Sequence, residues 1–210
     1  MAAGRELASF AMGTHDDLQP LEASMKSALI VVDVQQSFRE RPYWSETDAP
    51  RFMERLQALI DRCTAQRIPV LQVFHVEEDE GAGNPFSRRS GHVKTLPGLR
   101  IEPTEVFTKS VHSAMFASNA EGQSLDYWLR KHGIGRLIVS GIRTEQCCET
   151  TTRHASDLGY TVSYVMDATL TFKMVADSGR IYTPQDIMER TELVLAGRFA
   201  EIKRVETLQL

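Results

Sequence analysis

The sequence predicts an α/β sandwich, in which helices cover both faces of a mostly parallel sheet. Runs of apolar, β-branched residues alternate along the chain with segments of helical periodicity, as connected parallel strands require. The first run, Ala28-Leu-Ile-Val-Val-Asp-Val, is nearly all apolar, which is typical of a strand covered on both faces. With 210 residues, of which 42% are hydrophobic, the chain suffices for one well-packed core. We therefore expect an N-terminal arm over residues 1–25 and a single domain over residues 26–210.

The first half of the domain is predicted to contain three strands and one helix. After the strand from Ala28, apolar residues recur at helical spacing from Phe52 to Cys63, with Asp48 as a possible N-cap and Pro50 near the first turn. This helix should end before Ile68-Pro69. A second strand is predicted over 70–76 and a short one near 106–107, and between them lies an acidic, glycine-rich loop over 77–98. A loop of that length is usually functional, as a lid or as part of an interface.

The second half repeats the alternation of helix and strand. A short helix over 125–131 should be closed by Gly133, and a buried strand should follow over 136–141. Residues 144–158 have helical character up to Gly159, and residues 161–166 read as a strand. A helix over 184–195 and a last strand over 201–206 complete the predicted fold.

Composition favours a small-molecule partner over a macromolecular one. The net charge of −4 does not indicate the positively charged surface that a nucleic-acid-binding protein needs, and no apolar run is long enough to span a membrane. The first residues lack the apolar stretch of a signal peptide, so we expect a cytoplasmic protein. Three cysteines without a Cys-x-x-Cys pair predict reduced thiols, one of which is free for chemistry.

Three polar residues stand where predicted strands end, the edge at which open parallel sheets bind their ligands. Asp33 comes late in an apolar strand, Lys109 follows a short strand, and Cys147 follows the strand that ends at Gly141. Taken singly, each has a plainer interpretation. Asp33 would bind loop amides, Lys109 would be a solvated loop residue, and Cys147 would be a small buried hydrophobe.

The segment after Gly141 carries the most information. If Thr144 caps the following helix, Cys147 falls at its third position, where free N–H groups and Lys109 would keep the sulfur ionised even at low pH. Spacing alone barely separates Cys147 from Cys148. His154 lies seven residues further on, about 10 Å by helix rise, and so is no direct partner. For the remaining histidines without ligand spacing we expect a surface or core role; these are His15, His92, His112 and His132.

Three blocks together resemble the isochorismatase-like cysteine hydrolases. They are Val-Val-Asp33-Val-Gln-Gln-Ser-Phe, Thr-Lys109-Ser-Val-His-Ser-Ala, and Gly-Ile-Arg-Thr-Glu-Gln-Cys147-Cys-Glu-Thr-Thr, and their order and spacing agree over residues 28–171. The resemblance implies a three-layer α-β-α sandwich with a six-stranded sheet, and a triad of Asp33, Lys109 and Cys147 rather than Cys148. It also implies a cis peptide between Ile142 and Arg143, and an oxyanion hole made by the N–H groups of Arg143 and Cys147.

The resemblance also carries expectations about activity. The Asp-x-His metal pair of the nicotinamidase branch, sought soon after the first strand, is missing because residues 39–50 contain no histidine. We therefore expect no metal and no cofactor, a hydrolase of small amides, imides or ureides, and a homo-oligomer of two or four chains. Two alternatives stay open, a vinyl ether hydrolase of the isochorismatase type and a non-catalytic binding domain on the same scaffold.

Pocket-wall candidates are less certain to face a ligand, because each also suits core packing. They are Phe38, Trp44, Phe74 and His75. Arg143, four residues before the proposed nucleophile, would point either to solvent, which we favour slightly, or to the ligand. Because arginine pairs well with a carboxylate or imide, we expect substrates with an acidic or carbonyl-rich end.

Overall fold

The structure is a computed structural model, and it describes residues 25–77 and 83–210. The expected N-terminal arm, apart from Met25, and part of the expected loop therefore lie outside the described residues. Within the described ranges, no helix has the length and apolar content needed to cross a bilayer.

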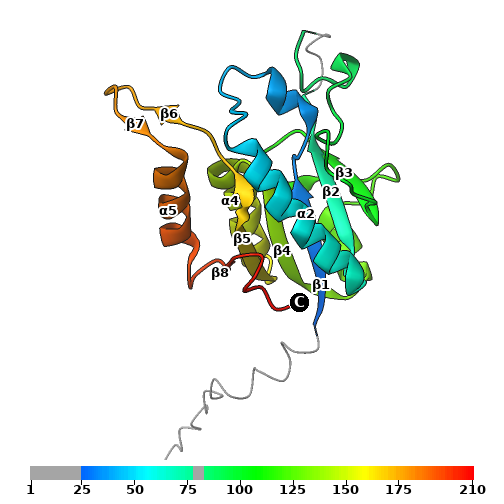
Figure 1. The fold of residues 1–210 in the computed structure, drawn as a ribbon. Coiled ribbons are helices and arrows are strands. Elements are labelled where there is room, and N and C mark those ends of the chain that lie inside the picture. The colour runs from blue at the N-terminus through cyan, green and yellow to red at the C-terminus, as the bar shows by residue number, and fades with distance from the viewer. Residues whose placement is uncertain (1–24, 78–82) are drawn as a thin grey trace, which may run out of the picture.

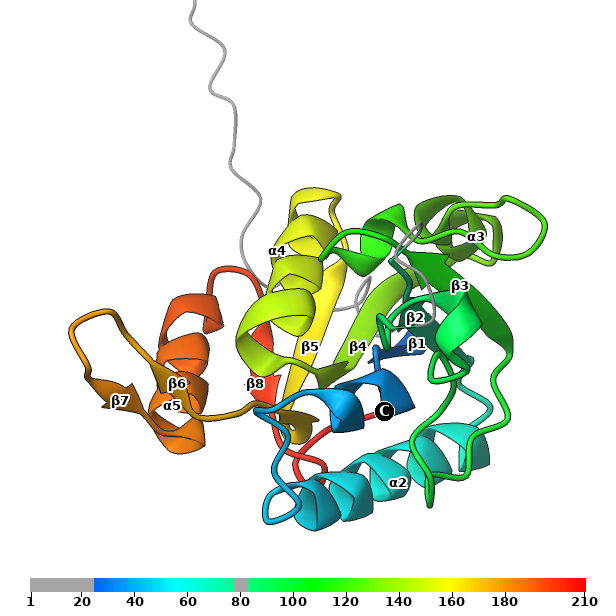
Figure 2. The same cartoon turned by 90° about the horizontal axis from the view of Figure 1, so that it is seen from above.

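The domain is built on one six-stranded parallel sheet in the order β3-β2-β1-β4-β5-β8 (Figures 1 and 2). The strands are β1 Lys26–Val32, β2 Val70–His75, β3 Glu105–Lys109, β4 Ile134–Ile142, β5 Thr161–Leu170 and β8 Glu201–Lys203. The order places β1 and β4 side by side at the centre, with every strand running in the same direction. Their carboxyl ends consequently share one edge, as the sequence predicts.

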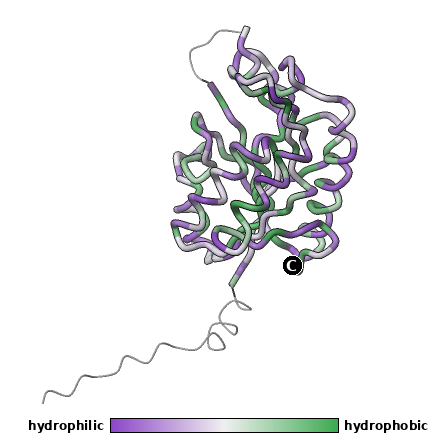
Figure 3. Tube along the Cα trace, turned by 90° about the vertical axis from the view of Figure 1, so that its left-hand side faces the viewer, coloured by the Kyte–Doolittle hydropathy of each residue, from purple (hydrophilic) through white to green (hydrophobic). Residues whose placement is uncertain are grey.

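Helices cover both faces of this sheet, which confirms the three-layer sandwich (Figure 2). They are α2 Ala49–Ala65, α3 Leu125–Lys131, α4 Glu149–Asp157 and α5 Pro184–Leu195. Successive residues of β1 alternate between two cores: Ala28 and Ile30 pack with residues of α3 and α4, whereas Leu29 and Val31 pack with residues of α2. This alternation explains why the strand is apolar from Ala28 onward. The trace in Figure 3 shows hydrophobic residues gathered inside the domain.

Three features differ from the sequence prediction. β5 continues to Leu170, beyond an irregularity in its pairing with β4, and an antiparallel hairpin, β6 Met174–Val175 with β7 Ile181–Tyr182, stands outside the main sheet. The last strand is shorter than predicted because residues 204–207 form a turn. The segment Thr144–Cys148 is a π-helical turn that leads into α4, not the first turn of a regular helix.

Gly141 allows β1 and β4 to approach closely at the edge that carries the polar residues. It has a φ of 128°, and a Cβ atom built on it would lie 2.0 Å from the carbonyl oxygen of Val32. Directly after Val32, Asp33 adopts a φ of 53°, a conformation that few non-glycine residues take. Both chain segments thus have a positive φ at the point where Asp33 leaves the sheet.

The segment after β2 is tied to the chain that follows β1. The backbone N–H groups of Gln36 and Ser37 donate to the carbonyls of Lys94 and His92. Phe86 and Leu96 are buried in the α2 core, so the described part of the 77–98 loop is packed onto the domain beside the shared strand edge. Its expected role as a lid or an interface element stays a prediction.

Candidate active site

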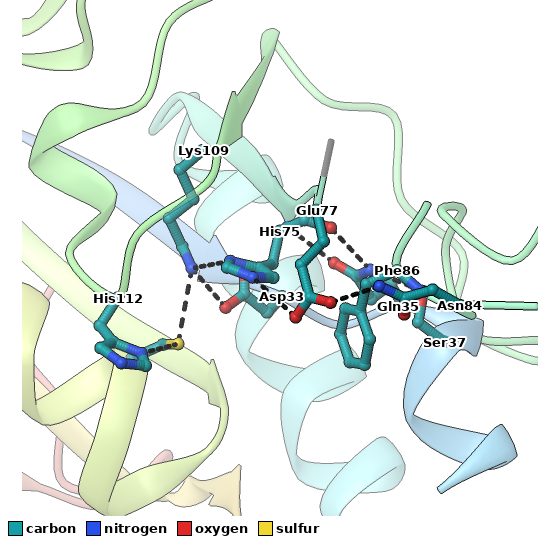
Figure 4. Close-up of polar contacts among 10 residues, drawn as sticks. Asp33, Gln35, Ser37, His75, Glu77, Asn84, Phe86, Lys109 and His112 are labelled. Carbon is teal, nitrogen blue, oxygen red and sulfur yellow. Dashed lines mark hydrogen bonds and ion pairs between the residues drawn. The ribbon is translucent and has the colours of Figure 1, made fainter. Parts of the chain in front are cut away.

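The side chains of Asp33, Lys109 and Cys147 meet at the carboxyl edge of the sheet (Figure 4). Lys109 Nζ lies 2.7 Å from Asp33 Oδ2 and 3.5 Å from Cys147 Sγ. The three residues follow or end β1, β3 and β4, so the fold gathers segments that lie far apart in the sequence. The structure thus places together the three residues that the sequence analysis singles out.

Burial makes this ion pair a strong electrostatic feature. The side chains of Lys109 and Asp33 are both fully buried. Burial alone would lower the pKa of Lys109, but the negative charge of Asp33 and the hydrogen bonds to Asp33 and Cys147 raise it above its ordinary value, so Lys109 is an ammonium. Removing one partner would leave an uncompensated buried charge, at a cost of about 3–5 kcal/mol.

The ionisation state of Cys147 corrects the sequence prediction of a thiolate at low pH. Burial and the negative charge of Asp33 raise the pKa of the Cys147 thiol to about 12, and the opposing effect of Lys109 is smaller. The resting state is therefore a neutral thiol beside a carboxylate and an ammonium. The prediction failed because it weighed the helix terminus and Lys109 but not the loss of solvent.

The two neighbouring cysteines have different surroundings. Cys148 is completely buried in the core between the sheet and α3 and α4, where burial raises its thiol pKa well above the ordinary value. Cys63 lies in the opposite core, on α2. Only Cys147 contacts both Lys109 and His112, so it is the thiol placed for chemistry.

The turn that carries Cys147 is held by backbone and hydroxyl contacts. The peptide bond between Ile142 and Arg143 is cis, and the Arg143 carbonyl accepts from the N–H groups of Gln146 and Cys148. Thr144 does not cap the helix as expected. Its hydroxyl donates instead to Thr169 Oγ1 at 2.8 Å, because residue 143 occupies the cap position.

Arg143 is buried, which overturns the preferred expectation that its side chain points to solvent. Its Nη2 lies 2.8 Å from Glu145 Oε1, and the guanidinium sits over the rings of Tyr43 and Phe172, at 5.1 and 5.7 Å from their centroids. Glu145 also accepts from the Thr171 hydroxyl at 2.6 Å. Aromatic faces and a carboxylate replace water around the cation, and Nε is left without a partner.

His75, at the end of β2, is placed against the cluster. Its Nδ1 lies 3.4 Å from Lys109 Nζ, and its Nε2 lies 3.6 Å from Glu77 Oε1 (Figure 4). Burial, followed by the charge of Lys109, lowers the pKa of His75 below its ordinary value. The imidazole is consequently neutral at neutral pH.

The sequence analysis missed His112. It expected a surface or core role, but His112 Nδ1 lies 4.0 Å from Cys147 Sγ, and the residue is exposed at the open side of the cluster. The available signal was its place three residues after Lys109 in the polar block at the strand end. No periodicity distinguishes such a loop histidine from one that faces solvent.

The aromatic pocket candidates divide between core and site. Phe38 is buried against Phe86, with ring centroids 5.1 Å apart, and Phe86 in turn packs on the His75 ring at 5.7 Å. Phe38 is therefore one ring removed from His75 and acts in core packing. Trp44 packs on Phe172, and Phe74 is half-buried in β2. Among the described residues, no group of three His, Cys, Asp or Glu side chains is arranged to hold a metal ion.

Comparison with known proteins agrees with this architecture. The isochorismatase domain model matches residues 27–181. A Bacillus subtilis isochorismatase family protein, YrdC, is 24% identical over 87% of this chain and 94% of its own length. Nicotinamidase 3 of Arabidopsis thaliana is 26% identical, with 87% of each chain covered.

Solved structures show the same fold. A hydrolase of the isochorismatase family from Chromobacterium violaceum superposes with a TM-score of 0.75 at 22% identity, covering 87% of this chain and 91% of the other. N-carbamoylsarcosine amidase from Thermoplasma acidophilum superposes with a TM-score of 0.65 at 19% identity, covering 89% and 100%. Since the family model spans most of the domain, including the segments that carry Asp33, Lys109 and Cys147, the chain belongs to the isochorismatase family of hydrolases.

Proposed function

We propose that this hydrolase cleaves a C–N bond of a small amide, imide or ureide through a thioester on Cys147, without a metal ion. The contact of one buried ammonium, Lys109, with both Asp33 and Cys147 carries the proposal. It gives a nucleophile, a base and a cation within one hydrogen-bonded group, which is the arrangement that nucleophilic catalysis needs.

The first half-reaction begins from the neutral thiol. Because the pKa of Cys147 is about 12, ionisation has to be coupled to attack, and Asp33 takes the S–H proton as the sulfur adds to the carbonyl carbon. The carbonyl π electrons move to oxygen. When they return, the C–N bond breaks and the nitrogen leaves with the proton from Asp33. A thioester on Cys147 remains.

The second half-reaction uses the same groups in reverse. Asp33 removes a proton from water, the hydroxide adds to the thioester carbon, and the C–S bond breaks. The sulfur recovers the proton and the carboxylic acid is released. Lys109 keeps a positive charge beside the base and the sulfur throughout, so negative charge never accumulates there unpaired.

We assign stabilisation of the oxyanion to the backbone N–H groups of Arg143 and Cys147, which flank the turn. Fixed donors of this kind contribute about 3 kcal/mol to a transition state that carries charge on oxygen. They need no charged side chain, so the Arg143 guanidinium has no part in this step.

Two observations support the proposed substrate class, the names of the relatives and the surroundings of Arg143. Nicotinamidase 3 and N-carbamoylsarcosine amidase bear names that denote amide-bond hydrolysis. In this chain the Arg143 guanidinium is paired with the Glu145 carboxylate, next to the nucleophile turn. A substrate carboxylate or imide would replace Glu145 as its partner, which favours substrates with an acidic or carbonyl-rich end.

A screen for ammonia release tests the proposal. Small primary amides and ureides would be assayed for ammonia, and imides for loss of the starting compound, each with and without a carboxylate and with the parent protein, Cys147→Ala and Cys148→Ala. We expect turnover by the parent and by Cys148→Ala and none by Cys147→Ala. Equal turnover by Cys147→Ala, or hydrolysis of a vinyl ether that survives Cys147→Ser, would overturn the assignment.

A further inference from the structure

The ammonium of Lys109 has three N–H bonds and three neighbours that can accept them. Besides Asp33 Oδ2 and Cys147 Sγ, the third is His75 Nδ1 at 3.4 Å, at the long end of hydrogen-bond distance (Figure 4). A fully buried ammonium without solvent depends on such neighbours. An acceptor for the third N–H bond therefore helps to fix the rotation of the ammonium group, and with it the directions of the N–H bonds toward Asp33 and Cys147.

Nδ1 accepts only if the ring proton is on Nε2. The structure favours that tautomer, because Nε2 faces Glu77 Oε1 at 3.6 Å. Glu77 is itself held, since its other carboxylate oxygen accepts from the Asn84 side chain and its N–H donates to the Phe86 carbonyl. A carboxylate on the far side of an imidazole is a common means of fixing its tautomer.

The backbone of His75 is held as firmly as its ring. The Gln35 side chain accepts from the His75 N–H at 2.8 Å and donates to the His75 carbonyl at 3.0 Å. His75 is also the register partner of Lys109 between β2 and β3. Gln35 lies two residues after Asp33, so the same short segment that supplies the carboxylate also fixes the histidine.

We propose that His75 is a positioning residue for Lys109: its neutral imidazole accepts the third ammonium N–H and thereby directs the remaining two at Asp33 and Cys147. This role differs from that of the pocket-wall residue expected from the sequence. The inference rests on the proposed function of Lys109, but it holds whatever the substrate is.

Four charged or titratable groups face this imidazole. Lys109 and His112 oppose its protonation, whereas Asp33 and Glu77 favour it, and burial adds to the first pair. A protonated ring would lose the Nδ1 acceptor and place a second cation beside Lys109. The positioning role therefore requires His75 to stay neutral in the working pH range.

The first test is spectroscopic and needs no substrate. Two-bond ¹⁵N–¹H NMR spectra distinguish the tautomers of each histidine, and we expect His75 to be neutral with its proton on Nε2. Lys109→Met should raise the pKa of His75, because a cation beside Nδ1 is removed. A neutral ring with its proton on Nδ1, or a pKa that ignores Lys109→Met, would overturn the proposal.

The second test measures how fast iodoacetamide alkylates Cys147 at pH 8. His75→Leu removes the acceptor and should slow alkylation about tenfold, the effect of one unit of thiol pKa. His75→Asn keeps an acceptor near the position of Nδ1 and should stay within about threefold of the parent, a shift of less than half a unit. His92→Asn, away from the cluster, is the control and should change nothing. Circular dichroism would establish that each variant is folded.

These outcomes separate the possible roles. Equal slowing in His75→Leu and His75→Asn would show that the shape of the ring, not its acceptor, matters. An unchanged rate in His75→Leu would remove His75 from the positioning of Lys109. Because neither readout measures amide turnover, failure of the ammonia screen would leave the interpretation of both experiments intact.

Discussion

The charge of Asp33 controls the reactivity of Cys147 in two opposite ways. In the proposed mechanism Asp33 accepts the thiol proton during attack, whereas in the resting protein its negative charge helps to raise the thiol pKa to about 12. A carboxylate that only held Lys109 in place would still raise the thiol pKa, but it would not accept the thiol proton. Separating thiol ionisation from turnover therefore identifies the role of Asp33.

Asp33→Asn should abolish amide turnover and, at the same time, accelerate alkylation of Cys147 at pH 7. Removing the carboxylate charge lowers the thiol pKa, and each unit of lowering increases the thiolate fraction about tenfold. Alkylation rates over pH 6–10 would measure the change. In the parent the rate should rise steadily through this range. Asp157→Asn, exposed at the end of α4, serves as control, and a slower reaction in Asp33→Asn would contradict the assigned electrostatics.

Arg143 and Glu145 allow a second prediction, on specificity. Arg143→Gln should raise KM for anionic amides about tenfold to a hundredfold and change kcat less, because it removes a charge-assisted contact worth about 1.5–3 kcal/mol. Glu145→Gln should act in the opposite direction and lower KM, because it frees the guanidinium from its internal partner.

Comparing anionic with neutral amides checks this prediction, and thermal unfolding shows whether the buried pair is needed for stability. If both variants treat anionic and neutral amides as the parent does, Arg143 has no part in substrate binding. The specificity would then lie elsewhere, for example in the segment 83–98 that packs beside the strand edge.

At the scale of elements, the junction of β1 and β4 positions the site. Gly141 lets the two strands approach each other where Asp33 leaves the sheet. The π-helical turn that carries Cys147 begins at Thr144, three residues after Gly141. The buried carboxylate of Glu149 then joins the start of α4 to α5 through Arg190. The nucleophile turn is thus braced by the sheet before it and by α5 after it.

Gly141→Ala should destabilise the domain by more than the cost of its backbone conformation alone. Gly159 provides the matched control, since its φ of 89° also disfavours a side chain but its surroundings are open. We expect Gly159→Ala to cost about 1–3 kcal/mol and to stay active. Gly141→Ala should cost several kcal/mol more, since a Cβ 2.0 Å from the Val32 carbonyl forces the strands apart. Denaturant unfolding measures both, and equal costs would show that the close approach is not required.

At the scale of the whole molecule, the proposed mechanism uses the Lys109 ammonium and no metal ion. The described residues contain no group of His, Cys, Asp and Glu fit to bind one, and the Lys109 ammonium occupies the position between base and nucleophile. We expect the activity to survive exhaustive dialysis against a chelator, with metal content near zero by elemental analysis. Stoichiometric zinc together with loss of turnover on chelation would contradict this.

Much of the fold is encoded locally and could be predicted. β1, β2 and β4 are mostly apolar because the central residues of each strand are buried on both faces, and α2 repeats its apolar residues at helical spacing because it buries one side. The hairpin of β6 and β7 was not predicted, since strands of two residues carry too little pattern. The π-helical turn was not predicted, because the Thr144 hydroxyl does not cap a helix but donates a hydrogen bond to Thr169 in β5, a contact that the sequence does not reveal.

The sequence by itself determined the order of the elements and the sandwich, because apolar periodicity is a local property, and its resemblance to a known family singled out Asp33, Lys109 and Cys147. Only the tertiary structure decided the protonation of Cys147, the burial of Arg143 and the contacts of His75 and His112. Each of these depends on groups brought from several strands and on the exclusion of water around them. Desolvation and distance set the charge states of this site, and neither can be read from spacing along the chain.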